Sequence, residues 1–226
     1  RRTPRDRKDK MMSSALSLKL LLASLGVLRA DIPWVATFFN QSEGTALCAL
    51  TKGSRSEADC DHMTVVYNPP KSTMAKLRHH FGERVVVRAL AVAHDEHARA
   101  VMVHLESGTA AAISANDWPH STIAHGAAPY SPVYSNCLWE RAVAASNALV
   151  TRDSRGKPTS IAFPAAAQVW HGVLVEGKCS EGDTVYPATN ATIELLNQAD
   201  IPREFGATLC DNAEWQREEG RCIHGM

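Results

Sequence analysis

Two short segments of the chain share the pattern His-x-Thr-aliphatic. They are residues 62–65 (His-Met-Thr-Val) and residues 120–123 (His-Ser-Thr-Ile). Each has the composition of a β-strand, in which successive side chains point to opposite faces. Each histidine would therefore share a face with the threonine two residues later. We expect each strand to present an imidazole beside a hydroxyl group.

Two such strands, placed side by side, could hydrolyse a 2′,3′-cyclic or 2′-linked phosphodiester. One histidine would deprotonate the attacking water and the other would protonate the departing ribose oxygen, because the ordinary pKa of histidine, about 6.5, lies near working pH. The threonine hydroxyls could donate to the non-bridging phosphate oxygens. This chemistry needs no metal, so we expect no cofactor. Which histidine is the acid stays open, and either imidazole could instead be bonded to its neighbours without a chemical role.

The surroundings of both motifs resemble a known family. The block Trp118–Gly126 and the following residues 132–136 (Pro-Val-Tyr-Ser-Asn) are similar to the second motif region of the 2H phosphoesterase superfamily. They resemble in particular its LigT-like members, the cyclic-phosphodiesterase-like domains associated with eukaryotic RNA ligases. The block Asp61–Tyr67, with the two prolines after it, is similar to the first motif. The resemblance covers roughly Pro33 to Asn136.

The resemblance implies a bilobal α+β fold with a mostly antiparallel sheet and pseudo-twofold symmetry, in which the two motif strands line a central cleft. It implies that four residues are catalytic: His62, Thr64, His120 and Thr122. Four more are candidates for substrate binding, two of them as platforms for a base: Tyr67, His125, Tyr130 and Ser135. Two features depart from the family. The motif histidines are only 58 residues apart, and Ser121 stands where an aliphatic residue is usual, which we expect to weaken the packing of that strand.

The pattern of the remaining chain predicts the elements that would position these residues. Runs of β-branched and aromatic residues predict strands over residues 32–39, 61–67, 120–124 and 169–176. They also predict a hairpin of Val85–Ala93 and Ala98–Leu105, with His94 to His97 as its polar turn. Helices are expected over 72–81, 138–150 and 193–198, and residues 151–159 are expected to form a polar linker.

From this order we expect three parts. Residues 1–31 would be a basic tail plus a leader or first helix, residues 32–187 the 2H phosphoesterase-like domain, and residues 188–226 a short helix with a polar, cysteine-containing tail. A fold of this length can bury a substantial core. The segment from Ala15 to Ala30 is too short and too charged for a membrane span.

The composition limits the partners. Lys and Arg together number 24, as do Asp and Glu, so extended duplex nucleic acid is not an expected partner. An RNA terminus or a small cyclic nucleotide would need only a local polar site, and other RNA-repair or ligase components are possible partners. The chain has no phosphate-binding Gly-x-x-x-x-Gly-Lys-[Ser/Thr] loop and no Gly-x-Ser-x-Gly nucleophile elbow.

The six cysteines leave the compartment open. They are widely spaced, with no Cys-x-x-Cys pair, so three disulfides and six reduced thiols are both compatible with the sequence. We favour the cytoplasm or nucleus, but Met11 or Met12 could start a signal peptide. The tripeptides Asn40-Gln41-Ser42 and Asn190-Ala191-Thr192 match the acceptor pattern for N-glycosylation and favour the secretory alternative.

Two other functions fit the same sequence. The motif strands could form a non-catalytic module that binds a nucleotide or RNA end in the same fold. The chain could also be a secreted, disulfide-stapled domain of unrelated purpose. The run from His94 to His97 offers metal-ligand side chains, but we expect a solvated hairpin turn there, and we expect no metal site.

Overall fold

The computed structural model describes residues 34–50, 60–127, 129–130, 132–180, 182–196, 204–212 and 222. The chain divides into two compact units, Arg1–Ile32 and Pro33–Met226, and the fold below is that of the second. The expected basic tail and the leader or first helix lie outside the described residues.

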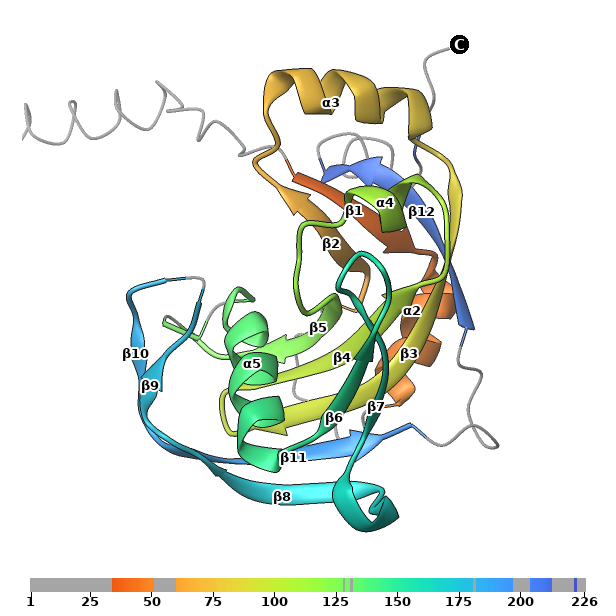
Figure 1. Ribbon diagram of the computed structural model, residues 1–226. Coiled ribbons are helices and arrows are strands. Elements are labelled where there is room, and N and C mark those ends of the chain that lie inside the picture. The colour runs from red at the N-terminus through yellow and green to blue at the C-terminus, as the bar shows by residue number, and fades with distance from the viewer. Residues whose placement is uncertain are drawn as a thin grey trace, which may run out of the picture. The chain divides into compact units, whose positions relative to one another are not determined.

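The described unit has an α+β fold built on a mostly antiparallel sheet (Figure 1). Eight strands form the main sheet, and neighbouring strands pair antiparallel. They are β1 (Trp34–Phe39), β2 (His62–Tyr67), β3 (Arg84–Asp95), β4 (Ala98–Leu105), β5 (His120–His125), β8 (Val169–Leu174), β11 (Thr189–Leu195) and β12 (Glu204–Asp211).

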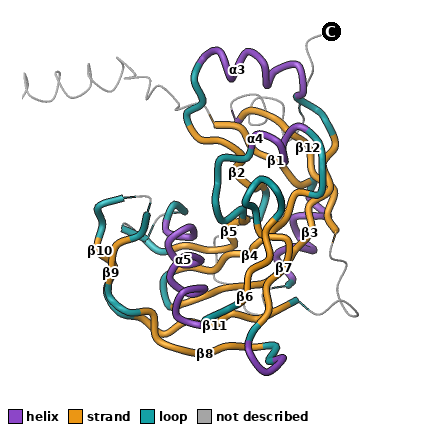
Figure 2. The backbone as a smooth tube through the Cα atoms, in the orientation of Figure 1, coloured by secondary structure: helices purple, strands orange, loops and turns teal. Residues whose placement is uncertain are grey.

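The long strand β3 organises this sheet. Its first half pairs with β12 and its second half with β11, while β4 runs along its other edge. The path β2-β1-β12-β3-β4-β5 therefore begins and ends with the two motif strands. The backbone tube in Figure 2 follows this curved path from β2 through β3 to β5. The curvature returns the two ends of the path toward each other.

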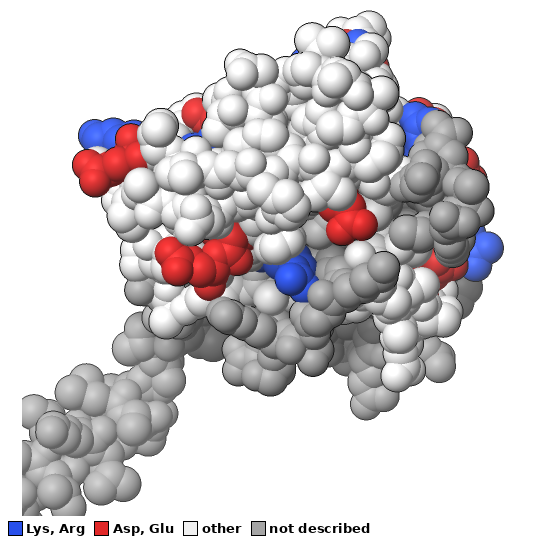
Figure 3. All heavy atoms as spheres, turned by 90° about the horizontal axis from the view of Figure 1, so that it is seen from below, with Lys and Arg blue, Asp and Glu red and all other residues white. Residues whose placement is uncertain are grey.

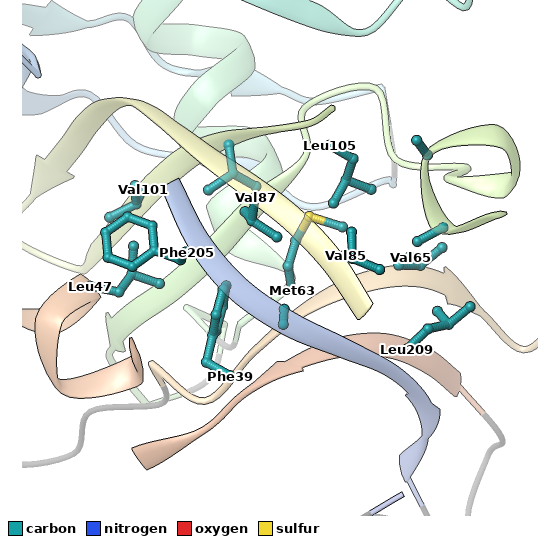
Figure 4. Close-up of a cluster of buried hydrophobic side chains, with 14 of the residues drawn as sticks. Phe39, Leu47, Met63, Val65, Val85, Val87, Val101, Leu105, Phe205 and Leu209 are labelled. Atoms are coloured by element: carbon teal, nitrogen blue, oxygen red, sulfur yellow. The ribbon is translucent and has the colours of Figure 1, made fainter. Parts of the chain in front are cut away.

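The larger core lies on the inner side of that path. Figure 4 shows Met63, Val85, Phe205 and their neighbours pointing toward one another from β2, β3 and β12. Met63 is fully buried and Val85 is 2% exposed. Burial of such side chains is worth about 1.5–3 kcal/mol each. Because Met63 and Val65 of β2 point into this core, the strand's other side chains lie on its opposite face.

Within the described residues, four α-helices accompany the sheet: α2 (Gln41–Ala49), α3 (Lys71–Leu77), α4 (Thr109–Ile113) and α5 (Tyr134–Ser146). Single 3₁₀ turns are η1 (Arg78–His80) and η2 (Pro164–Ala166). Helix α5 covers β3, β4, β8 and β11, and its Leu138, Trp139 and Ala142 are fully buried in a second core. Two small ribbons complete the unit: β6 (Leu149–Arg152) with β7 (Pro158–Ala162), and β9 (Gly177–Lys178) with β10 (Val185–Tyr186).

Several expected elements are wrong. The helix expected over 138–150 starts at Tyr134 and ends at Ser146, because Asn147 takes a left-handed conformation with φ 52°. The chain then enters the β6–β7 ribbon rather than a polar linker. Its turn is stabilised by Asp153, whose Oδ1 accepts hydrogen bonds from the backbone N–H groups of Arg155 and Lys157.

The helix expected over 193–198 is also wrong, since residues 189–195 form β11. Its side chains alternate between buried and exposed, with Ala191 and Ile193 in the second core. The predicted hairpin is confirmed, but its turn is shorter than expected because β3 continues to Asp95. Helix α2 was not predicted; Asn40 caps it by accepting a hydrogen bond from the backbone N–H of Glu43 at 2.9 Å.

All six cysteines are paired in the structure. The disulfides are Cys48–Cys60, Cys137–Cys179 and Cys210–Cys222, with Cα–Cα distances of 5.8, 5.3 and 5.8 Å. They tie the end of α2 to the start of β2, α5 to the segment after β9, and β12 to Cys222. Of the two alternatives that the sequence left open, the structure has the disulfides. Within the described ranges, no helix is long and apolar enough to cross a membrane.

Candidate active site

Strand β2 turns His62 and Thr64 away from the main core. Met63 and Val65 point into that core and are fully buried, so the strand's alternation directs the two motif residues to the opposite face. The His62 ring packs against the rings of Trp34 and Phe38, at centroid distances of 4.6 and 5.7 Å. The exposed fraction of the His62 side chain is 25%.

Strand β5 positions His120 and Thr122 in the same way. Ile123 lies in the same core as Val65, while His120 and Thr122 pair in register with Met102 and Ala100 on the face that α5 covers. His120 is 9% exposed and Thr122 is 8% exposed. The second motif is thus more enclosed than the first.

The two motifs share an irregularity in pairing. Along β2 the register passes from Val66 to Thr64 and skips Val65; along β5 it passes from Ala124 to Thr122 and skips Ile123. The extra residue is the aliphatic one of the motif in both strands. A bulge sharpens the local twist and re-aims side chains. Each His-x-Thr pair therefore sits directly beside a bend of the same kind.

The structure brings the two strands together at their histidines. The Ser121 hydroxyl donates a hydrogen bond to the backbone carbonyl of His62, with an O–O distance of 2.8 Å. Ser121 is fully buried, and its hydroxyl links the two motifs.

Hydrogen bonding determines the tautomer of His120. Its Nδ1 lies 2.7 Å from the carbonyl oxygen of Trp118, which can only accept, so Nδ1 carries a hydrogen. In the neutral ring Nε2 then holds a free lone pair. Burial lowers the pKa of His120 to about 4, against the raising effect of the Trp118 carbonyl, and a positive charge on the nearby His62 lowers it further. At neutral pH this imidazole is uncharged.

His62 has a different partner. Its Nδ1 lies 2.6 Å from the carboxylate Oδ1 of Asp61, which accepts the hydrogen of that nitrogen. Nε2 is the ring nitrogen left for other contacts. Sequence reasoning did not single out Asp61, although an acidic residue directly before the motif histidine was a visible signal.

The β6–β7 ribbon supports the segment before His120. Lys157 Nζ donates to the carbonyl of Asn116 at 2.9 Å, and Arg152 Nη1 donates to the carbonyl of Asp117 at 3.2 Å. The Arg152 guanidinium also lies 4.4 Å from the centre of the Trp118 ring. These contacts hold the turn whose carbonyl orients the His120 ring. Sequence analysis missed them because residues 151–159 were expected to be a linker.

The other candidates lie in different places. Ser135 is fully buried and accepts a hydrogen bond from the Thr122 hydroxyl at 3.0 Å, so it does join the motif. Tyr67 and His125 end their strands, each five residues from a motif histidine and therefore about 16 Å along the strand. Tyr67 is 62% exposed.

Tyr130 belongs to an aromatic cluster of its own. Its ring stacks on His97 at a centroid distance of 3.5 Å and meets Tyr134 and Tyr186 at 5.1 and 5.8 Å. Tyr134 donates its hydroxyl to Asp95. One face of the Tyr130 ring is thus occupied by His97. In the part of the chain that the structure describes, no three His, Cys, Asp or Glu side chains gather as metal ligands would.

We expect the buried His120 to make the fold sensitive to acid. Its pKa is about 4 in the folded protein and about 6.5 in an unfolded chain, so between these values the unfolded state binds more protons. Stability is therefore fully present above pH 6.5 and falls as pH decreases toward 4, by about 3 kcal/mol from this group. Denaturant unfolding of the wild type and of His120→Gln at pH 7 and pH 4 measures this; equal losses in both proteins would contradict the low pKa.

Comparison with known proteins identifies no family. No protein-family model matches the chain, and no curated protein matches it. Among solved structures, one described as the crystal structure of a fungal RNA kinase is similar, with 12% identity and a TM-score of 0.44 over 82% of this chain and 47% of that one. The chain thus spans about half the length of that structure. Similarity at this level says nothing about function.

Proposed function

We propose that this protein is a metal-independent phosphodiesterase that hydrolyses 2′,3′-cyclic or 2′-linked phosphodiesters of RNA ends or small nucleotides. One observation carries the proposal: the two His-x-Thr strands, far apart in sequence, meet at the bond between Ser121 and the His62 carbonyl. The two imidazoles are near enough for a positive charge on His62 to lower the pKa of His120.

The partners of the two rings favour a division of labour. His120 is neutral at physiological pH, with a lone pair on Nε2, so it is the base that takes a proton from the attacking water. His62 holds its Nδ1 hydrogen on Asp61, and its protonated form has a hydrogen on Nε2 to give. The water oxygen forms a bond to phosphorus, and the bond from phosphorus to the departing ribose oxygen breaks. That oxygen takes the proton from His62, and the product is a phosphomonoester.

The threonines would stabilise the negative charge on the non-bridging oxygens. Thr122 now donates its hydroxyl hydrogen to Ser135, and a hydroxyl can reverse that bond by rotation. Ser135 would then donate to Thr122, which frees the Thr122 hydrogen for a phosphate oxygen. Thr64, on the partly exposed face of β2, would do the same from the other side.

Membership of the 2H phosphoesterase superfamily belongs to this proposal. The matched register irregularities beside Val65 and Ile123 support the idea that the motifs are two copies of one structural unit. A bilobal arrangement with pseudo-twofold symmetry is the corresponding expectation for the whole unit. RNA termini, and through them other RNA-repair or ligase components, are the proposed partners.

The test is an assay of the full chain with an oligonucleotide ending in a 2′,3′-cyclic phosphate, with and without a chelator. We expect conversion to a single phosphomonoester isomer, at the same rate with chelator present. Phosphorus NMR of the product identifies which ester bond was broken. Turnover that disappears with the chelator would contradict the proposed chemistry.

The alternative is a module that binds the same ligand without turning it over. The enclosure of His120, which is only 9% exposed, favours this alternative because a base must reach the attacking water. A bound ligand raises the melting temperature by mass action. An intact cyclic phosphate together with a higher melting temperature would decide for binding and against catalysis.

A further inference from the structure

We propose that this protein folds in an oxidising secretory compartment and carries N-linked glycans on Asn190 and Asn40. The inference rests on the disulfides and the exposed acceptor sites, and it is independent of the proposed function. It also replaces our preference, drawn from the sequence, for the cytoplasm or nucleus.

The first observation is that the chain leaves no thiol unpaired. The six cysteines of the sequence form three bridges, and each ties a helix or strand to a segment outside it. The Cα–Cα distances of 5.3 to 5.8 Å lie in the range that a disulfide requires. Reducing compartments keep thiols reduced, whereas secreted proteins keep such bridges. Three bridges form when six thiols lose six protons and six electrons to the dithiol–disulfide oxidants of the compartment.

The second observation is the placement of Asn190. Ala191 and Ile193 point into the core under α5, so the alternation of β11 turns Asn190 and Thr192 to the opposite face. Asn190 is exposed there. Directly across the strand pair lies Val173, an apolar side chain that is 56% exposed. A glycan on Asn190 would cover this valine.

The side of the molecule that carries β8 and β11 is accessible and poor in charge. Figure 3 views the unit from that side and shows Lys, Arg, Asp and Glu only as scattered groups in a broad uncharged surface. An uncharged, hydrophilic oligosaccharide would keep such a surface in solution without adding charge.

The second acceptor, Asn40, is exposed and also caps α2. Its Oδ1 accepts hydrogen bonds from the backbone N–H of Glu43 and from the hydroxyl of Ser42, at 2.9 and 2.7 Å. Glycosylation takes place at Nδ2 and leaves Oδ1 a carbonyl oxygen. The cap is therefore compatible with a glycan at the same residue.

The modification is a glycosyl transfer. Asn Nδ2 forms a bond to the anomeric carbon of an oligosaccharide carried on a polyprenyl diphosphate, the bond from that carbon to the diphosphate oxygen breaks, and Nδ2 loses one proton. The compartment supplies this donor, and the protein supplies only the acceptor tripeptides.

The experiment uses the full chain, tagged at its C-terminus, in cells that naturally make it. Extraction under denaturing conditions with a thiol-alkylating reagent is followed by intact mass measurement before and after peptide-N-glycosidase treatment. We expect no alkylated cysteine and two glycans, each of which leaves an Asp in place of its carrier Asn. An unglycosylated mass or alkylated cysteines in the folded protein would overturn the proposal.

Matched variants assign the sites. Asn190→Gln and Thr192→Val should each remove one glycan, whereas Thr192→Ser keeps the acceptor pattern and should retain it. Asn40→Gln should remove the other glycan. A glycan that survives Asn190→Gln together with Asn40→Gln would overturn the assignment to these residues.

Discussion

Replacing either motif histidine by alanine is expected to lower the turnover of a 2′,3′-cyclic phosphate by about 10²–10⁴-fold, the usual contribution of one general acid or base. His62→Ala removes the proposed acid and His120→Ala the proposed base. The two losses are not expected to add in the double variant, because both groups act in one step. The measurement is the single-turnover rate at saturating substrate.

The matched control is His171→Ala. This histidine is exposed on β8, where its Nδ1 pairs with the Thr192 hydroxyl, and it does not belong to the motif strands. We expect its rate to equal that of the wild type. Unchanged turnover in both His62→Ala and His120→Ala would remove the catalytic assignment, whatever their effect on binding.

The pH profile of the same reaction separates the two roles. Because the pKa of His120 is about 4, the acidic limb of kcat/KM should lie well below the ordinary histidine value of about 6.5. Asp61→Asn removes the carboxylate beside His62 and keeps its shape. This variant should lower the rate, because the His62 ring loses the carboxylate that holds its Nδ1 hydrogen, and it should leave the acidic limb of the profile in place. A shift of the acidic limb in this variant would reverse the two roles.

The motif strands could be predicted because their information is local. His62 and His120 each begin a run whose alternation separates a polar from an apolar face. Burial alternates in β2 as expected, whereas residues 120–123 of β5 are all buried. The strands of the β3–β4 hairpin were predicted for the same reason. An α+β fold with antiparallel pairing followed from these elements.

The contacts between distant segments could not be predicted. Ser121 looked like a defect because its partner, the His62 carbonyl, lies 59 residues away in sequence. Residues 193–198 suggested a helix because the pairing of residues 193–195 with β3 and β8 is invisible in a local window. The tautomer of His120 depends on the Trp118 carbonyl. The segment that holds this carbonyl is supported by the β6–β7 ribbon, whose residues have the composition of a polar linker.

The disulfides differ in the length of chain that they close, and this difference predicts their separate contributions to stability. Cys137–Cys179 spans 42 positions and joins α5 to the segment after β9, whereas Cys48–Cys60 spans 12. A bridge limits the freedom of the unfolded chain more when its loop is longer, which corresponds to about 4 kcal/mol for the longer loop and about 3 kcal/mol for the shorter.

Removal of Cys137–Cys179 by a double replacement with alanine is therefore expected to lower the free energy of unfolding by about 4 kcal/mol, and removal of Cys48–Cys60 by about 3 kcal/mol. Denaturant unfolding of the two double variants measures both values. The wild type under a reductant loses all three bridges, Cys210–Cys222 included, and should be less stable than either variant. The longer bridge also anchors the helix that carries Ser135. Its loss should therefore weaken the hydrogen bond between the Thr122 and Ser135 hydroxyls. If the variant without the short bridge were the less stable of the two, chain entropy would not be the main contribution of these disulfides.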